Sequence, residues 1–201
     1  MALIAKEKTG GGGFAPIEAG TYPARCCAVV DLGLQNVEWQ GQRKEQEKVL
    51  LMFELPTERV EVDGVDKPRL QSIKYTMSLN EKSGLRKALD AWRGKPMTAE
   101  ELNGFYVGNL VNAPCMLTIV QQDGKNGAYT KIGGIGKPMK GMPIPDLEGE
   151  PILFDMESDD AEEVFKKLPE WVQKIVEESV TWKERKATFT ETGDDDEGLP
   201  W

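Results

Sequence analysis

The sequence contains no histidine, the side chain most often used as a general base and as a metal ligand. Its absence excludes Ser-His and Cys-His nucleophile pairs and every metal site built on imidazole. The three cysteines, Cys26, Cys27 and Cys115, are an odd number and show no CxxC spacing. They predict reduced thiols in a cytoplasmic protein, and neither a disulfide framework nor a zinc site. We therefore expect a binding protein without metal or cofactor, and not an enzyme.

Long hydrophobic runs are also missing. The longest span only a few residues, whereas a helix that crosses a bilayer needs about 20. The N-terminus becomes charged at Lys6, so it lacks the apolar stretch of a secretory signal. With 39% hydrophobic and 29% charged residues among 201, the chain can bury a core. We expect no membrane segment, and one folded domain with an appendage.

The charges are divided unevenly along the chain. Residues 1–141 hold 19 Lys and Arg against 16 Asp and Glu, whereas residues 142–201 hold 6 against 18. The body is therefore mildly basic and the C-terminal part strongly acidic. This asymmetry is typical of a domain that binds a polyanion and carries an acidic tail.

Hydrophobic alternation and turn signals predict a mainly β fold. A helix that Asn80 or Ser83 caps and Gly94 ends stands between the third and fourth strands, and Trp92 lies on its apolar face. This is the order of the OB-fold, a five-stranded barrel, although SH3-like and other small barrels share much of the pattern. Residues 34–47 are expected to form a long loop or ribbon. The predicted strands span residues 21–32, 48–55, 71–77, 115–120 and 128–135.

Composition divides the chain into four parts. Residues 1–15 form a glycine-rich flexible arm, and residues 16–141 form the predicted barrel. Residues 142–182 combine a proline-rich linker with short amphipathic helices, one of which carries an apolar stripe from Leu168 to Val176. That stripe can dock on the barrel, on a partner or on a second copy. Residues 183–201 have no periodicity and are expected to be disordered.

The end of the chain is the most specific signal. Four acids followed by Leu-Pro-Trp cannot fold alone, and a tryptophan left in water indicates a docking peptide. The acids would be steered to basic partners while Trp201 enters an apolar pocket. A solvated terminus that only aids solubility is the alternative. The predicted partner-binding residues are Asp194, Asp195, Asp196, Glu197, Leu199, Pro200 and Trp201.

This tail resembles the acidic, aromatic-tipped C-termini of single-stranded DNA-binding proteins, with Trp201 in place of the usual phenylalanine. The body resembles phage-encoded OB-fold members of that class over about residues 14–140. The resemblance implies a protein that coats single-stranded DNA in replication or recombination without reading its sequence. It also implies recruitment of replication or recombination proteins through the tail. The matching stretches are residues 20–22, 48–55, 75–85, 89–95 and 131–132.

Such a function needs cations along the phosphates and flat rings on which bases stack. In OB-folds the groove crosses the second and third strands, between the first-second and fourth-fifth loops. Alternation places Lys48 and Lys74 on faces opposite Phe53 and Ile73, so both can point into such a groove. The candidate DNA-binding residues are Trp39, Arg43, Lys44, Lys48, Lys74, Tyr75, Lys125, Tyr129, Lys131, Lys137 and Lys140.

Each candidate has a plain structural alternative. Tyr75 alternates with core residues and can be buried, Trp39 can pack on a neighbouring loop, and any lysine can be a solvated surface charge. Trp92 is expected to fill the end of the barrel. The glycine-rich stretch before Lys137 lacks the spacing of a phosphate loop.

Three hypotheses remain. The first is a non-enzymatic single-stranded DNA-binding protein, able to form homo-oligomers. The second is an acidic OB-fold adaptor that binds a host replication protein and never touches DNA. The third, a metal-dependent nuclease, needs carboxylates that converge in a cleft, and the acids at 159–163 are better explained as a helix start.

Overall fold

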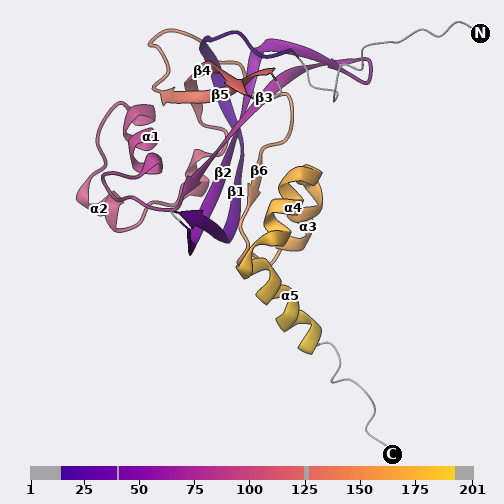
Figure 1. Cartoon of the computed structure of the whole chain (residues 1–201). Helices are drawn as coiled ribbons and strands as arrows, with labels where there is room; N and C mark the ends of the chain where they lie inside the picture. The colour runs from indigo at the N-terminus through magenta and orange to yellow at the C-terminus, as the bar shows by residue number, and fades with distance from the viewer. Residues whose placement is uncertain (1–14, 40, 125–126, 193–201) are drawn as a thin grey trace, which may run out of the picture.

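The computed structural model describes residues 15–39, 41–124 and 127–192 and is mainly β. Figure 1 shows the helices of residues 84–103 on one side of the strands and those of residues 161–192 on the other. No helix in these described ranges is long and apolar enough to cross a membrane. The strands are β1 (Gly20–Trp39), β2 (Gln42–Val62), β3 (Val65–Thr76), β4 (Pro114–Gly124), β5 (Gly127–Gly136) and β6 (Ile152–Phe154). The helices are α1 (Gly84–Arg93), α2 (Ala99–Asn103), the 3-10 turn η1 (Val107–Leu110), α3 (Ala161–Lys167), α4 (Glu170–Glu178) and α5 (Val180–Thr192).

The strands form one sheet in the order β3-β2-β1-β4-β5, and β6 pairs with β1. All neighbours are antiparallel except β6, which runs parallel to β1. The edge strands β3 and β5 approach each other. Within the described residues, however, no hydrogen-bonded ladder joins them. The barrel that we expected is therefore not closed.

All five expected strands are present, and several are longer than their hydrophobic pattern. Residues 34–39 and 42–47 form a two-stranded ribbon, because β1 continues to Trp39 and pairs there with Gln42 of β2. Pro56 does not end β2, contrary to the pattern. The strand continues to Val62 across a register shift between Leu55 and Arg59. Proline has no backbone N–H, and within this irregularity its absence removes no hydrogen bond between the two strands.

The inner face of the sheet encloses a first hydrophobic core. Every second residue of β2 from Val49 to Leu55 points into it. Helix α1 lies across the end of this core, where Trp92 contacts Phe53 at 5.6 Å between ring centroids. The indole Nε1 of Trp92 donates a hydrogen bond of 2.7 Å to the carbonyl oxygen of Pro114. The expectation that Trp92 fills the end of the sheet is confirmed.

The opposite face of β1 and β2 is buried under the C-terminal helices, and this is a second core. Leu50 and Met52 of β2 pack there against the stripe formed by Leu168, Val172 and Val176. The stripe therefore docks on the chain's own sheet. Since both sides of β2 are covered, its central residues are apolar at consecutive positions, which is typical of a strand between two layers.

The connection from β5 to β6 has no regular structure, as expected of a linker, but it is fastened to the sheet. The guanidinium of Arg25 donates hydrogen bonds of 2.9 Å to the carbonyl oxygens of Ile144 and Pro145. The buried carboxylate of Glu54 accepts a hydrogen bond of 3.1 Å from the backbone N–H of Glu148. These contacts fix the position of the C-terminal helices relative to the strands.

The prediction of disorder from residue 183 is wrong for residues 183–192, which belong to α5. The helix has no apolar stripe, so periodicity could not reveal it. Its first turn is held instead by Ser179, whose Oγ accepts a hydrogen bond of 3.1 Å from the N–H of Trp182. The buried ring of Trp182 stacks on Phe165 at 4.9 Å. Residues 193–201 and 1–14 lie outside the described residues.

We expect Trp182→Ala to lower the free energy of unfolding by about 3–5 kcal/mol, because the substitution opens a cavity between α5, α3 and the sheet. Trp171→Ala is the matched control, since that tryptophan is 44% exposed on α4. It should change stability by less than about 1 kcal/mol. Urea unfolding followed by circular dichroism measures both. Equal effects would show that the second core contributes nothing to stability.

Candidate nucleic-acid interface

The fold separates an acidic part of the chain from a basic part. Residues 15–66, which include β1 and β2, hold 5 Lys and Arg against 10 Asp and Glu. Residues 142–187 pack on those strands and hold 6 against 13. Residues 67–141 reverse the balance with 12 against 5. They comprise most of β3 together with α1, α2, β4 and β5. Positive charge is therefore concentrated on one part of the molecule.

Exposed lysines account for most of this excess. In the described part of the chain, none of the lysines named below forms an ion pair with a carboxylate. Two nearby acids are already neutralised, since Asp90 pairs with Arg86 at 2.8 Å and Glu101 pairs with Arg93. We call the following lysines the basic surface: Lys74, Lys82, Lys87, Lys95, Lys131, Lys137 and Lys140.

Helix α1 packs against both β3 and β5, the two strands that carry Lys74 and Lys131. The side chain of Lys137, just beyond β5, lies over Gly94 at the end of α1. A Cβ at Gly94 would come within 2.9 Å of the Cδ of Lys137. Gly94 has a left-handed φ of 66°. Glycine is therefore favoured at this position both by the backbone conformation and by the lack of room for a Cβ. The ammonium of Lys137 also stands near the negative end of the helix dipole.

Two strands add outward-facing groups. Lys74 lies opposite Leu50 of β2 and Lys131 opposite Val120 of β4, so both point away from the inner core. Tyr129 is on the same face of β5 as Lys131 and is 47% exposed. Its hydroxyl donates a hydrogen bond of 2.9 Å to the side-chain oxygen of Gln122. A cation and an oriented ring thus stand side by side on one strand.

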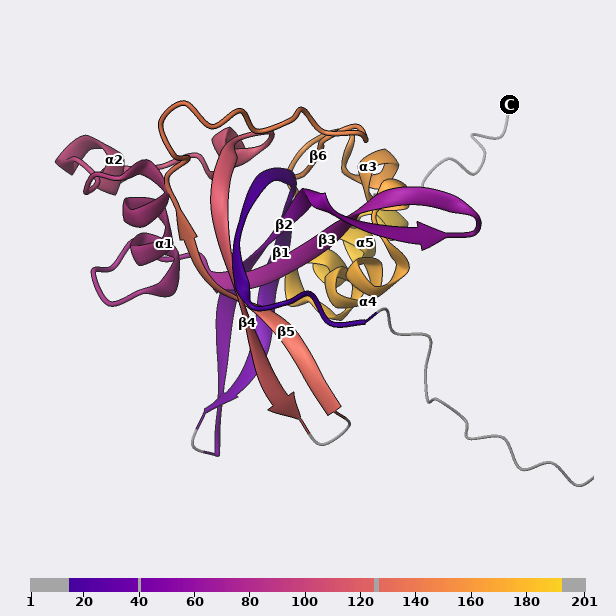
Figure 2. The same ribbon diagram turned by 90° about the horizontal axis from the view of Figure 1, so that it is seen from above.

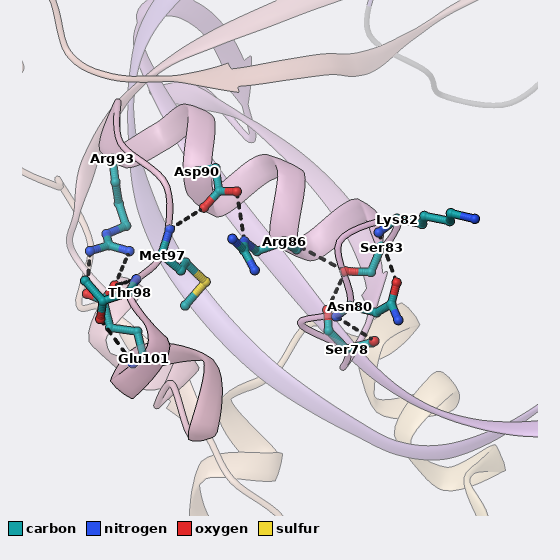
Figure 3. Close-up of polar contacts among 10 residues, drawn as sticks. All are labelled: Ser78, Asn80, Lys82, Ser83, Arg86, Asp90, Arg93, Met97, Thr98 and Glu101. Carbon is teal, nitrogen blue, oxygen red and sulfur yellow. Dashed lines mark hydrogen bonds and ion pairs between the residues drawn. The ribbon is translucent and has the colours of Figure 1, made fainter.

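Polar contacts hold α1 and its flanking loops in place (Figure 3). Ser83 caps the helix, and its Oγ accepts a hydrogen bond of 3.2 Å from the N–H of Arg86. At the other end, the carboxylate of Asp90 accepts bonds from Arg86 Nε at 2.8 Å and from the Met97 N–H at 2.9 Å. The backbone that carries Lys87 of α1 and the flanking Lys82 and Lys95 is therefore held in place.

Helix α2 is tied to α1 through a capping box. Glu101 accepts a hydrogen bond of 2.7 Å from the backbone N–H of Thr98, and Thr98 Oγ1 accepts one of 3.3 Å from the N–H of Glu101. The same carboxylate receives two bonds from the guanidinium of Arg93 at the end of α1 (Figure 3). These bonds, to Thr98 first and then to Arg93, lower the pKa of Glu101 below 4.5, its ordinary value.

Two predicted DNA-binding residues are otherwise engaged. The Nζ of Lys48 donates hydrogen bonds of 2.7 Å to the side-chain oxygens of Gln46 and Thr76, and burial lowers its pKa. Tyr75 is half-buried on the core face, where a Cβ at Gly84 would lie 3.3 Å from its ring. Burial raises the pKa of Tyr75 to about 12. The structure thus favours the core interpretation of Tyr75 over base stacking.

Arg43 and Lys44 are exposed near the end of the β1–β2 ribbon, opposite Glu38 and Val37. This ribbon and the β4–β5 hairpin extend in the same direction in Figure 2, apart from α1. The remaining candidates, namely the Trp39 side chain, Lys125 and the docking residues Asp194, Asp195, Asp196, Glu197, Leu199, Pro200 and Trp201, lie outside the described residues.

Sequence reasoning missed three members of the basic surface, Lys82, Lys87 and Lys95. The signal was present, because Lys87 falls on the side of α1 opposite Leu85 and Leu89. The periodicity that identifies the buried face of this helix therefore also identifies the solvent face that carries Lys87.

Other chemistry finds no support in the described residues, where no group of three His, Cys, Asp or Glu could hold a metal ion. All three cysteines are free thiols. Burial raises the pKa of Cys26 and raises that of Cys27 and of Cys115 to about 12, so these thiols stay protonated at neutral pH.

No family model matches this chain. No curated protein matches it either.

The lowered pKa of Glu101 predicts a pH-dependent contribution to stability. The ionised carboxylate stabilises the fold above pH 4.5, and this effect is lost as the pH falls through the depressed folded-state pKa. We expect Glu101→Gln to lower the urea midpoint at pH 7, and the difference from the original chain to shrink at pH 3. Glu100→Gln on the exposed side of α2 is the control and should have little effect at either pH. A difference independent of pH would refute the assigned role.

Proposed function

We propose that this chain binds single-stranded DNA without sequence preference and that its basic surface holds the phosphates. The observation that carries the proposal is the concentration of unpaired, exposed lysines on β3, α1, β5 and the adjoining loops. Lysines on a solvated face with no binding role would be interspersed with acids. Here two of the nearby acids, Asp90 and Glu101, are paired with arginines. Glu81 and Glu100 remain exposed, but the lysines outnumber them and are available to an external polyanion.

The strand arrangement supports an OB-fold as the framework. The order β3-β2-β1-β4-β5, with a helix between β3 and β4, is that of an OB-fold barrel opened between β3 and β5. The exposed ring of Tyr129 beside Lys131 supplies the combination of stacking and charge that single strands use. In a duplex the faces of the bases are already stacked on one another, so they are not available to stack on such a ring. We therefore propose a preference for single strands.

The second core modifies the expected path of the strand. In a bare OB-fold the outer face of β2 belongs to the groove, but here Leu50 and Met52 of that face are sealed under α3–α5. The helices above them are acidic and would repel phosphates. The proposed path therefore avoids the part of β2 under these helices and runs over β3, β5 and α1. It includes Lys74, which lies on β3 opposite Leu50, together with Lys131 and Lys137, and it adds Lys87 of α1 and the flanking Lys82 and Lys95.

We further propose that the terminal residues 194–201 recruit replication or recombination proteins. Their four acids, followed by Gly-Leu-Pro-Trp, combine charge that basic partners attract with an aromatic ring that an apolar pocket can hold. An adaptor that binds such proteins without touching DNA is the competing proposal. The DNA-binding proposal requires the lysines of the basic surface for binding, whereas the adaptor proposal does not.

Replacement of Lys82, Lys87 and Lys95 by alanine together should weaken binding to labelled oligo-dT. Removal of three phosphate contacts would reduce the slope of log K against log salt by roughly 2, at about 0.7 per phosphate. Fluorescence anisotropy at several salt concentrations measures the slope. A duplex of equal length, bound more weakly, tests the preference for single strands.

The matched control replaces Lys166, Lys167 and Lys174, which are exposed on α3 and α4, by alanine. This variant loses the same charge but should keep its affinity and slope. Equal loss in both variants would mean that only net charge matters and would overturn the assigned surface. Absence of binding to any DNA at low salt would favour the adaptor.

Deletion of residues 194–201 should leave the affinity for oligo-dT unchanged or raise it, because it removes negative charge that competes with DNA. The same deletion should abolish capture of host replication proteins by the immobilised chain. Trp201→Ala separates the ring from the acids and should abolish capture alone. A marked loss of DNA affinity on deletion would contradict the docking role.

A further inference from the structure

A second feature of the molecule lies at the end of the inner core, away from α1. A cavity of about 330 Å³ opens there between β1, β6 and the chain around η1. Its lining includes four carboxylates and neither lysine nor arginine: Asp31, Glu47, Asp155 and Glu157. We call it the acidic pocket. It is independent of the basic surface, and its charge excludes DNA and the acidic residues 194–197 as occupants.

One of the carboxylates is already costly to ionise. Asp31 is largely removed from solvent, and this burial raises its pKa, while its Oδ1 accepts a hydrogen bond of 2.8 Å from the N–H of Gly33. The neighbouring charges of Asp155 and Glu47 act in the same direction. A cation in the pocket would relieve this accumulation of negative charge.

The pocket also exposes apolar surface. Met77, Tyr106 and Leu153 line it and are 41%, 57% and 38% exposed, among the most exposed large hydrophobic side chains of the described residues. Apolar walls next to carboxylates fit a peptide in which hydrophobic residues adjoin lysines. A small metal ion would contact only the carboxylates, and a neutral apolar ligand would contact only the apolar walls.

We propose that the acidic pocket binds the chain's own N-terminal segment, residues 3–8, through its apolar pair and its two lysines. This segment reads Leu-Ile-Ala-Lys-Glu-Lys, so Leu3 and Ile4 meet the apolar walls while Lys6 and Lys8 meet the carboxylates. The four glycines at 10–13 stand between this segment and the first described residue, Ala15. No other segment outside the described residues combines apolar and basic side chains in this way.

Chain length is compatible with this occupant. The carbonyl oxygen of Ala15 accepts a hydrogen bond of 2.5 Å from Arg69 on β3, and Met77 of the pocket lies eight residues further along the chain. Eight residues of strand correspond to about 26 Å. The nine residues from Lys6 to Ala15 span up to about 30 Å when extended. The segment can therefore reach its own pocket in an extended form, or that of a second copy without constraint.

Zero-length carbodiimide cross-linking of the full chain tests the proposal, because this reagent joins a lysine amine to a carboxylate only when the two are in contact. Mass spectrometry should find Lys6 or Lys8 linked to Asp155 or Glu157. A mixture of ¹⁴N and ¹⁵N chains distinguishes links within a chain from links between copies, and either places the segment in the pocket. Links from these lysines spread over exposed acids such as Asp159 and Glu163 would overturn the proposal.

A second measurement does not depend on cross-linking. In amide NMR spectra of the full chain, Lys6→Glu combined with Lys8→Glu should shift Gly33 and Gly108, which line the pocket, and leave Gly94 and Gly149 unchanged. Asp155→Asn with Glu157→Gln should remove this response to the lysine changes. The matched control Asp159→Asn with Glu163→Gln should retain it. Unchanged Gly33 and Gly108 signals in the lysine variant would refute occupancy.

Discussion

The burial of β2 on both faces is the constraint on which the rest of the structure depends. The strand contributes alternate residues to two separate cores, and each core fixes a different part of the molecule. The inner core positions α1 across β3 and β5, whereas the outer core holds the C-terminal helices. Because one strand serves both, the position of the lysines and that of the acidic layer are set by the same register.

This arrangement has an electrostatic result. The acidic segments 15–66 and 142–187 are stacked on each other, and the basic segment 67–141 forms the remaining part of the sheet and its helix. The uneven division of charge along the sequence therefore becomes a separation of charge in space. A molecule with a total charge of −9 can thus present a basic surface to a polyanion. The four carboxylates of the acidic pocket all come from the two acidic segments, whereas Met77 and the chain around η1 complete its wall from the basic segment.

Local features were predictable from the sequence because local physics determines them. Alternation and turn signals located all five main strands, and the capping residue Ser83 marked the start of α1. The left-handed Gly94 ended α1 as expected. These signals depend on neighbours only a few residues away.

Features that depend on distant contacts were not predictable in the same way. Nothing near Pro56 shows that the ladder tolerates a missing donor, and α5 depends on the contact of Trp182 with Phe165 rather than on its own periodicity. Likewise, the pattern around Lys48 gave its face correctly but could not show that Gln46 and Thr76 occupy its ammonium. The closure of a barrel is also a long-range property, and the pattern of five strands did not determine it.

The location of the outer core has a consequence for biosynthesis. Leu50 and Met52 leave the ribosome long before Val172 and Val176, the residues that cover them, have been translated. During that interval the nascent sheet presents an uncovered apolar face to other chains and to chaperones. Translation of an mRNA truncated before α3 would yield a chain in which that apolar face stays uncovered. By covering the face, the acidic C-terminal helices therefore also protect the chain against aggregation.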